Sequence, residues 1–133
     1  MSAAADPLKI LIVDDYDLFA AALYGALTPY EDLSVVGRAA DGVEAVAAAT
    51  ELRPDVVLMD VDMPRLDGLR ATRIVRDKLP ETAVVVVSGS HDAETAARAR
   101  SAGASAFVFK SCPVEDLVAA VREAKRGVAA RAA

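Results

Sequence analysis

Residues 56–60 read Val-Val-Leu-Met-Asp, a short apolar run that ends at a carboxylate. Pro54 lies before this run, and Met63-Pro64 begins a loop after it. Residues 83–87 form a second apolar run, Ala-Val-Val-Val-Val, which is followed by Ser88. Neither run alternates apolar with polar residues, and such continuity is typical of strands that are covered on both faces. The two runs therefore predict parallel strands buried between two layers of helices.

Outward from these runs, strand-like and helix-like segments alternate along the chain. The predicted strands are residues 8–13, 33–40, 56–59, 83–87 and 106–109, and the predicted helices are residues 17–27, 41–53, 67–78, 92–102 and 113–127. Asp41 and Glu44 resemble a capping box at the start of the second helix. Gly103 and Gly127 are expected to end the fourth and fifth helices. This order predicts an α/β fold with a doubly wound parallel sheet.

Length and composition favour one globular domain. The chain has 133 residues, of which 54% are hydrophobic, and this content argues against a disordered chain. The net charge of −5 argues against nucleic-acid binding by the domain as a whole. The basic residues near the C-terminus are instead expected to lie solvated in a last helical turn.

The single cysteine and the short apolar runs indicate the cellular compartment of the protein. Cys112 is the only cysteine, so an intrachain disulfide is excluded and a reducing compartment is favoured. Residues 1–7 contain no apolar core of a signal peptide, and no apolar run is long enough to span a bilayer. We expect a soluble cytoplasmic protein that makes no membrane contact.

Polar residues follow four of the predicted strands. Asp14-Asp15, Asp60, Ser88 and Lys110 each come directly after an apolar run. Each has an ordinary explanation when taken alone: a helix cap, a turn, a loop serine or a solvated lysine. Parallel strands, however, bring all four to one edge of the sheet, where ligands bind in this class of fold. We therefore expect one functional site at this edge.

The predicted crowding of carboxylates indicates the chemistry of that site. Neighbouring carboxylates repel one another unless one is protonated or a cation joins them. Oxygen ligands without histidine or cysteine favour a hard cation, with Mg²⁺ as the leading choice. A carboxylate beside Mg²⁺ and a lysine can act as a nucleophile that forms an acyl phosphate. The hydroxyl of Ser88 can donate a hydrogen bond to a phosphoryl oxygen.

These residues also resemble the signature of a known family. Asp14-Asp15, the run Asp60-Val61-Asp62-Met63-Pro64-Arg65-Leu66-Asp67-Gly68, Ser88 and Lys110 look like bacterial response-regulator receiver domains of the CheY-like superfamily. The resemblance implies a (βα)₅ flavodoxin-like three-layer sandwich with strand order 2-1-3-4-5. It places the receiver domain at residues 8–127. Residues 1–7 would be an N-terminal extension, and residues 128–133 a tail or the start of a linker.

The resemblance also implies a role for each site residue. Asp60 would be the phosphoacceptor, with a sensor histidine kinase as the usual donor. Asp15 and Asp60 would bind Mg²⁺ through their carboxylates, Asp62 through its backbone carbonyl and Asp14 through water. Ser88 and Lys110 would contact the phosphoryl group. Ser88 and Phe107 would form the switch, because Phe107 lies three residues before Lys110, where the family has its aromatic switch residue.

The function implied is that of a signalling module in a two-component system. It would catalyse only its own phosphotransfer and dephosphorylation. Phosphorylation would change the face formed by the fourth helix, fifth strand and fifth helix, which a partner or a second copy of the domain would read. The residues Ser111-Cys112-Pro113 resemble receivers that precede a LuxR-type helix-turn-helix, although Tyr16 stands where that subgroup often has histidine. A transcriptional output outside this chain is therefore expected; a stand-alone receiver or phosphorelay module is the alternative.

Three other functions fit the sequence less well. Asp60-Val61-Asp62 matches the DxD of haloacid-dehalogenase-type phosphatases, but those enzymes carry it on their first strand. A binding module that no longer phosphorylates is disfavoured because every expected side chain of the site is present. An FMN-binding flavodoxin-like protein is disfavoured because no Ser/Thr/Gly-rich phosphate loop follows the first predicted strand.

Overall fold

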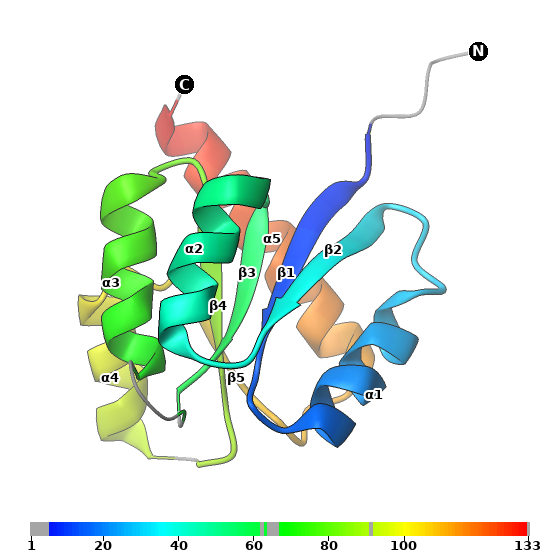
Figure 1. The fold of residues 1–133 in the computed structure, drawn as a ribbon, viewed down its shortest axis with the longest axis horizontal. Helices are drawn as coiled ribbons and strands as arrows, with labels where there is room; N and C mark the ends of the chain where they lie inside the picture. Colours follow the sequence, from blue (N-terminus) through cyan, green and yellow to red (C-terminus); the bar gives the residue numbers. More distant parts are fainter. Residues whose placement is uncertain (1–5, 62, 64–66, 91, 133) are drawn as a thin grey trace.

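The computed structural model describes residues 6–61, 63, 67–90 and 92–132. Within these residues the chain forms five strands that alternate with five helices (Figure 1). The strands are β1 (Leu8–Val13), β2 (Leu33–Ala39), β3 (Val56–Asp60), β4 (Ala83–Ser88) and β5 (Ala106–Phe109). The helices are α1 (Asp17–Leu27), α2 (Gly42–Leu52), α3 (Gly68–Lys78), α4 (Ala93–Ser101) and α5 (Val114–Ala132). The predicted alternation is confirmed. None of these helices combines the length and the apolar character that crossing a membrane requires.

The strands form one parallel sheet in the order β2-β1-β3-β4-β5. This order confirms the doubly wound fold and the expected strand order. From β1 the chain first adds β2 on one side and then β3 on the other, so the direction of winding reverses between β1 and β3. Val13 pairs with Met59 across these two strands. The next residues of the two strands, Asp14 and Asp60, therefore emerge side by side at the switch point, where such folds bind ligands.

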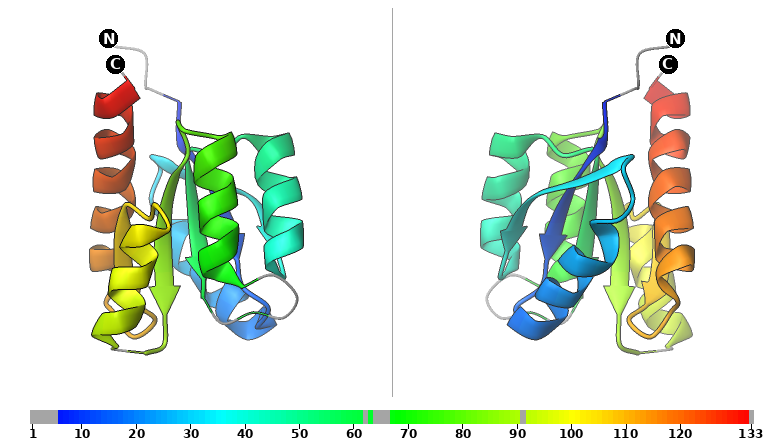
Figure 2. Two further views of the ribbon diagram at one scale, coloured as in Figure 1. Left: turned by 90° about the vertical axis from the view of Figure 1, so that its left-hand side faces the viewer. Right: turned by 90° about the vertical axis from the view of Figure 1, so that its right-hand side faces the viewer.

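Helices cover both faces of the sheet (Figure 2). One core lies between the sheet and helices α1 and α5, and the other lies between the sheet and helices α2, α3 and α4. Successive residues of a strand point to opposite faces, so Leu58 belongs to the first core and Met59 to the second. Strands β3 and β4 are buried along their whole length, as their unbroken apolar runs predict.

Helix α2 begins as its sequence predicts. The Asp41 carboxylate accepts a hydrogen bond from the Glu44 amide at 2.9 Å. The Glu44 side chain in turn accepts one from the backbone of Ala40 at 3.1 Å. Asp41 therefore caps the helix as expected, while the return bond from Glu44 reaches Ala40, the residue before the N-cap.

Helix α5 departs from the prediction. Gly127 does not end it, since the helix continues to Ala132. The reason is that Val128, only 2% exposed, packs into the core beneath α1 and α5. This burial outweighs the roughly 1 kcal/mol by which glycine disfavours a helix interior.

The basic residues of α5 are also not simply solvated. Arg122 donates two hydrogen bonds, of 2.8 and 2.9 Å, to the Asp32 carboxylate. Lys125 donates to the Glu81 carbonyl at 2.8 Å and lies 3.4 Å from Asp55. These residues tie the helix to the loops that precede β2, β3 and β4, at the end of the sheet opposite the predicted site.

Two glycines provide a matched test of this fold. Gly127 lies inside α5 with open space around it, so Gly127→Ala should raise the free energy of unfolding by about 0.5–1 kcal/mol. Gly103 has φ +103°, and an added Cβ would lie 3.1 Å from Arg76, so Gly103→Ala should lower it by about 1 kcal/mol or more. Urea unfolding measures both variants. A loss of stability in Gly127→Ala would contradict a helix that continues through residue 127.

Candidate functional site

Three carboxylates meet at the carboxyl ends of β1 and β3. One oxygen from each of Asp14, Asp15 and Asp60 lies within 4.8 Å of the others. Asp14 and Asp60 are only 1% and 3% exposed, whereas Asp15 is open to solvent. The predicted cluster is confirmed. Since burial and mutual repulsion both disfavour the charged form of a carboxylate, such a cluster needs positive charge nearby.

Lys110 supplies part of this charge. Its ammonium nitrogen lies 3.2 Å from Asp14 Oδ2 and 3.4 Å from Asp60 Oδ1. Burial of the side chain works against its charged form, but the charges of Asp60 and Asp14, together with hydrogen bonds to them, raise the pKa of Lys110 overall. Lys110 is therefore an ammonium ion at neutral pH. Of the described residues, Lys110 brings one positive charge to these three carboxylates, so the cluster also suits a divalent cation, and its all-oxygen donors fit Mg²⁺.

The acidic residues after β1 do not cap the following helix. The N-cap of α1 is Tyr16, which makes no side-chain capping bond. Asp14 instead turns back, and its Oδ1 accepts a hydrogen bond from the Tyr16 amide at 2.8 Å. The simplest alternative explanation for the acidic pair is therefore wrong, since Asp14 contributes to the cluster and not to a cap.

Ser88 lies at the end of β4 and is fully buried. Its Oγ accepts a hydrogen bond from the Ser90 amide at 3.0 Å. Its carbonyl accepts a bond of 2.7 Å from the Lys110 amide, which links the ends of β4 and β5. Through this link the backbone of Ser88 fixes the point from which the Lys110 side chain reaches the carboxylates.

Phe107 lies on β5, opposite Val86 of β4. It is half-buried against the core beneath α2, α3 and α4, and its ring meets that of Phe109 edge to face, with 5.6 Å between centroids. Ser88 shares this face of the sheet, since it lies two residues beyond Val86. The two residues predicted to form the switch therefore lie on the same side of neighbouring strands. The predicted contribution of the Asp62 carbonyl lies outside the described residues.

Gly68 is a site residue that sequence reasoning gave no role of its own. It begins α3, and a Cβ added to it would overlap the backbone oxygen of Asp60. Its carbonyl accepts a hydrogen bond of 2.7 Å from the buried Thr72 hydroxyl, while Asp67 caps the helix by accepting from the Arg70 amide. Only glycine lets α3 start directly against the end of β3. The sequence signal is a glycine at a helix start, where glycine usually has no advantage over a better helix former.

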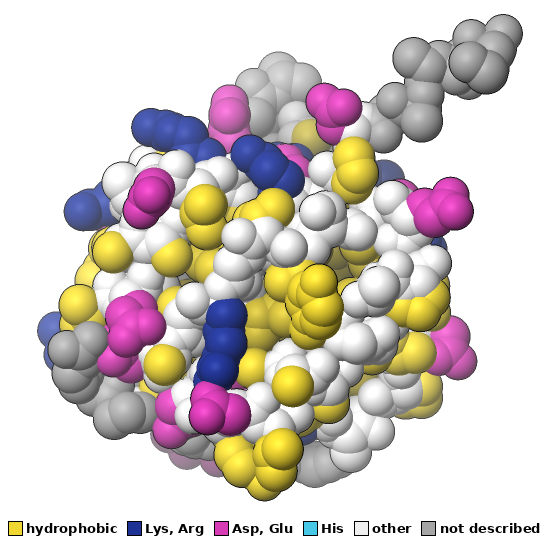
Figure 3. All heavy atoms as spheres, turned by 45° about the vertical axis from the view of Figure 1, so that its right-hand side comes forward, with side chains coloured by type: hydrophobic (Ala, Val, Ile, Leu, Met, Phe, Trp, Pro, Cys, Tyr) yellow, Lys and Arg dark blue, Asp and Glu magenta, His cyan; other side chains and the backbone are white. Residues whose placement is uncertain are grey.

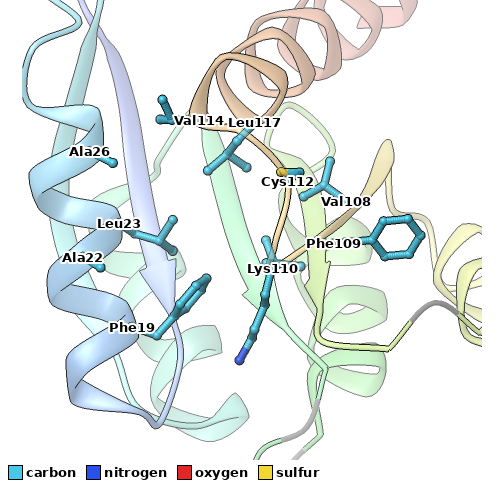
Figure 4. A pocket seen from close by; sticks show the side chains of 11 residues that line it. Phe19, Ala22, Leu23, Ala26, Val108, Phe109, Lys110, Cys112, Val114 and Leu117 are labelled. Carbon is cyan, nitrogen blue, oxygen red and sulfur yellow. The ribbon is translucent and has the colours of Figure 1, made fainter.

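An apolar groove opens beside Lys110, between α1 and the β5–α5 segment (Figure 4). Its volume is about 170 Å³, and its lining includes Phe19, Leu23, Cys112 and Leu117. Burial, reinforced by the charge of Asp116, raises the pKa of the Cys112 thiol, so this cysteine is a poor nucleophile at neutral pH. Cys112 instead packs, half-buried, against the core beneath α1 and α5, two residues before α5 begins.

A second groove lies between α1 and β2, on a face where hydrophobic side chains gather in a hollow (Figure 3). At its edge, Arg38 forms an ion pair with Asp17 at 2.6 Å. Arg38 also donates a hydrogen bond of 2.8 Å to the Asp14 carbonyl. Arg38 therefore joins the end of β2 to the start of α1 and to the acidic loop that connects β1 with α1.

Comparison with known proteins gives consistent results. The chain matches the family described as the response regulator receiver domain over residues 10–122. It is 35% identical over 120 residues to the response regulator protein VraR from Staphylococcus aureus, which covers 90% of this chain and 57% of VraR. The chain thus spans a little over half the length of this relative.

Solved structures agree in fold. The receiver domain of the response regulator NarL from Mycobacterium tuberculosis has a TM-score of 0.87 and 31% identity, covering 92% of this chain and 99% of its own. A chain of the CheX–CheY–BeF₃–Mg²⁺ complex from Borrelia burgdorferi has a TM-score of 0.82 and 25% identity, covering 89% of each chain.

The position of Gly68 generates a direct test. Gly68→Ala should lower the free energy of unfolding by about 1–3 kcal/mol, because α3 must move away from the Asp60 backbone. Gly25→Ala is the matched control: Gly25 lies in α1, and a Cβ added to it would meet no neighbouring atom within 4 Å, so this variant should be unchanged or slightly more stable. Urea unfolding of both variants tests the contact. Equal stability of Gly68→Ala and the parent chain would show that the close approach does not exist.

Proposed function

The chain belongs to the family of response regulator receiver domains, and we propose that its Asp60 carboxylate accepts a phosphoryl group from a sensor histidine kinase. The observation that carries this proposal is the position of Asp60. It is buried at the end of β3, within 4.8 Å of two other carboxylates, and it shares the Lys110 ammonium with Asp14. The family assignment also favours a receiver over a haloacid-dehalogenase-type phosphatase. In this role the chain turns over no separate substrate.

The proposed transfer needs only the phosphohistidine donor and a proton from solvent. An Asp60 carboxylate oxygen attacks phosphorus and forms an O–P bond, while the P–N bond of the phosphohistidine donor breaks. The electron pair of that bond stays on the imidazole nitrogen, which takes a proton from water. The product is an acyl phosphate on Asp60. Lys110 holds its ammonium beside the attacking carboxylate, where it can balance the negative charge on the phosphoryl oxygens.

Mg²⁺ is the proposed cofactor. Asp15 and Asp60 would bind it through their carboxylates, Asp14 through water and Asp62 through its backbone carbonyl. The bound ion supplies positive charge that stabilises the transferring phosphoryl group. The all-oxygen acidic cluster supports this assignment, as does the Mg²⁺ in the CheX–CheY complex of Borrelia burgdorferi. The exposure of Asp15 leaves this side of the cluster open to an incoming ion.

The output of the signal would lie outside this chain. The relative VraR is a response regulator longer than the segment that matches, and structures of LuxR-family regulators contain the same fold. We propose that phosphorylation controls transcription in the cytoplasm through an attached output domain. The face formed by α4, β5 and α5 would pass the change to that domain or to a second copy of the receiver.

Phosphorylation at Asp60 can be tested with a small donor. Acetyl phosphate with Mg²⁺ should add one acid-labile phosphoryl group, seen as about 80 Da by intact mass spectrometry. Asp60→Asn should abolish the addition because an amide is a poor nucleophile. Asp55→Asn is the matched control, since Asp55 directly precedes the other end of the same strand and its replacement should leave labelling unchanged. Full labelling of Asp60→Asn would contradict the assignment of Asp60 as the phosphorylated residue.

The switch residues give a separate prediction. Ser88 Oγ accepts from Ser90, so its hydroxyl hydrogen can be donated to a phosphoryl oxygen on Asp60. If Ser88 moves towards the phosphate, Phe107 on the same face can turn into the space that it leaves. Ser88→Ala should therefore still be phosphorylated but lose most of the phosphate-dependent NMR shifts in residues 93–121. Ser90→Ala, a change at an exposed neighbour, should keep them. Equal shifts in Ser88→Ala and the parent would rule out this coupling.

A further inference from the structure

The aromatic ring of Phe19 lies against the ammonium group of Lys110. The nitrogen is 4.7 Å from the ring centroid, which is within the range of a cation–π contact. In Figure 4 the two side chains approach each other from opposite sides, Phe19 from α1 and Lys110 from the end of β5. The same nitrogen lies 3.2 and 3.4 Å from the carboxylates of Asp14 and Asp60. Among the described residues, the ammonium thus has the two carboxylates of Asp14 and Asp60 and the ring of Phe19 as neighbours.

Phe19 is held in place by its surroundings, so its ring can restrict the position of the Lys110 ammonium. It lies in the first turn of α1 and packs, half-buried, against the core beneath α1 and α5. Arg38 fixes this turn by pairing with Asp17 at 2.6 Å and by donating to the Asp14 carbonyl at 2.8 Å. The ring is therefore placed by the same contacts that place the acidic loop.

Lys110 needs a neighbouring group that restricts it, because its side chain is long and flexible. A lysine has four methylene groups and pays a large entropy cost when it is fixed in one conformation. Here the apolar groove of about 170 Å³ opens directly beside its stem, so packing does not enclose it on that side. Gly89 also lies near the Lys110 side chain but has no side chain to pack against it. A Cβ added to Gly89 would lie 4.0 Å from Lys110 Cδ, so there is space beside the lysine here too.

We propose that Phe19 is a positioning residue, whose ring face holds the Lys110 ammonium over the Asp14–Asp60 pair. This inference rests on the proposed function, in which Lys110 contacts the transferring phosphoryl group. It assigns Phe19 a part in the reaction without contact with the phosphoryl group. The simpler explanation is that Phe19 only fills the core. In that case any apolar side chain of similar size would serve, whereas the proposal requires an aromatic ring.

Two substitutions separate these explanations. Phe19→Leu keeps an apolar side chain but removes the ring, and Phe19→Tyr keeps the ring. Leu23→Val is the packing control: Leu23 lines the same groove one turn further along α1 and belongs to the same core. The rate of phosphorylation by acetyl phosphate at saturating Mg²⁺ and the Mg²⁺ affinity are measured for each variant. The NMR shift of the Lys110 ε-methylene is recorded as well, since a ring at this distance should move it upfield.

The proposal expects a specific pattern. Phe19→Leu should phosphorylate about three- to tenfold more slowly, with Mg²⁺ affinity near that of the parent, and should lose the upfield shift of the Lys110 ε-methylene. Phe19→Tyr should restore both the rate and the shift, and Leu23→Val should retain them. The proposal is overturned if Phe19→Leu keeps the parent rate, or if Leu23→Val slows the reaction as much as Phe19→Leu does.

These measurements distinguish a failure of the proposed role of Phe19 from a failure of the proposed receiver function. If the parent chain took up no phosphoryl group at all, the receiver function would fail. The ε-methylene shift would still decide the position of Lys110, because it needs no phosphate. An unshifted ε-methylene in the parent, or the same shift in Phe19→Leu, would show that the ring does not hold the ammonium.

Discussion

The structure depends on one electrostatic constraint, which is the crowding of Asp14, Asp15 and Asp60 within 4.8 Å. A parallel sheet imposes this crowding, because adjacent strands β1 and β3 end at the same level and each ends in a carboxylate. Two of the three are almost fully buried, so water cannot screen their repulsion. The site must therefore hold positive charge, and among the described residues Lys110 provides one such charge. The same imbalance supports the proposed binding of a divalent cation and of a charged phosphoryl group.

The rest of the fold keeps these charges in place. The hydrogen bond from the Lys110 amide to the Ser88 carbonyl positions the backbone from which the lysine side chain extends. Arg38 fixes the loop that carries the acidic pair. Gly68 lets α3 start against the backbone of Asp60. The ion pairs of Arg122 and Lys125 lie at the other end of the sheet, where they tie α5 to the loops before the strands. The acidic cluster and the contacts that position it thus lie at one end of the sheet, and the ion pairs that hold α5 lie at the other.

The strands, the helices and most of the acidic site could be predicted from the sequence, because they follow from local sequence patterns. The buried strands are visible as unbroken apolar runs, and the residues that follow them are the site residues Asp14, Asp60, Ser88 and Lys110. What escaped prediction depends on contacts between distant segments. The continuation of α5 through Gly127 requires the core that buries Val128, and the role of Gly68 requires the Asp60 backbone. In the sequence, Phe19 is one apolar residue of a helix face, and only the fold brings Lys110 to its ring.

The central claim, that the carboxylates at the ends of β1 and β3 form one divalent-cation site, can be tested with Mn²⁺ as a paramagnetic substitute for Mg²⁺. Traces of Mn²⁺ are added to the ¹⁵N-labelled chain, and the broadening of each amide resonance is recorded. The account predicts selective broadening around Asp14, Asp15 and Asp60, reversed by excess Mg²⁺, while resonances near the carboxylates at the opposite end, Asp32 and Asp55, stay sharp. Equal broadening at both ends of the sheet, or none at the cluster, would contradict it.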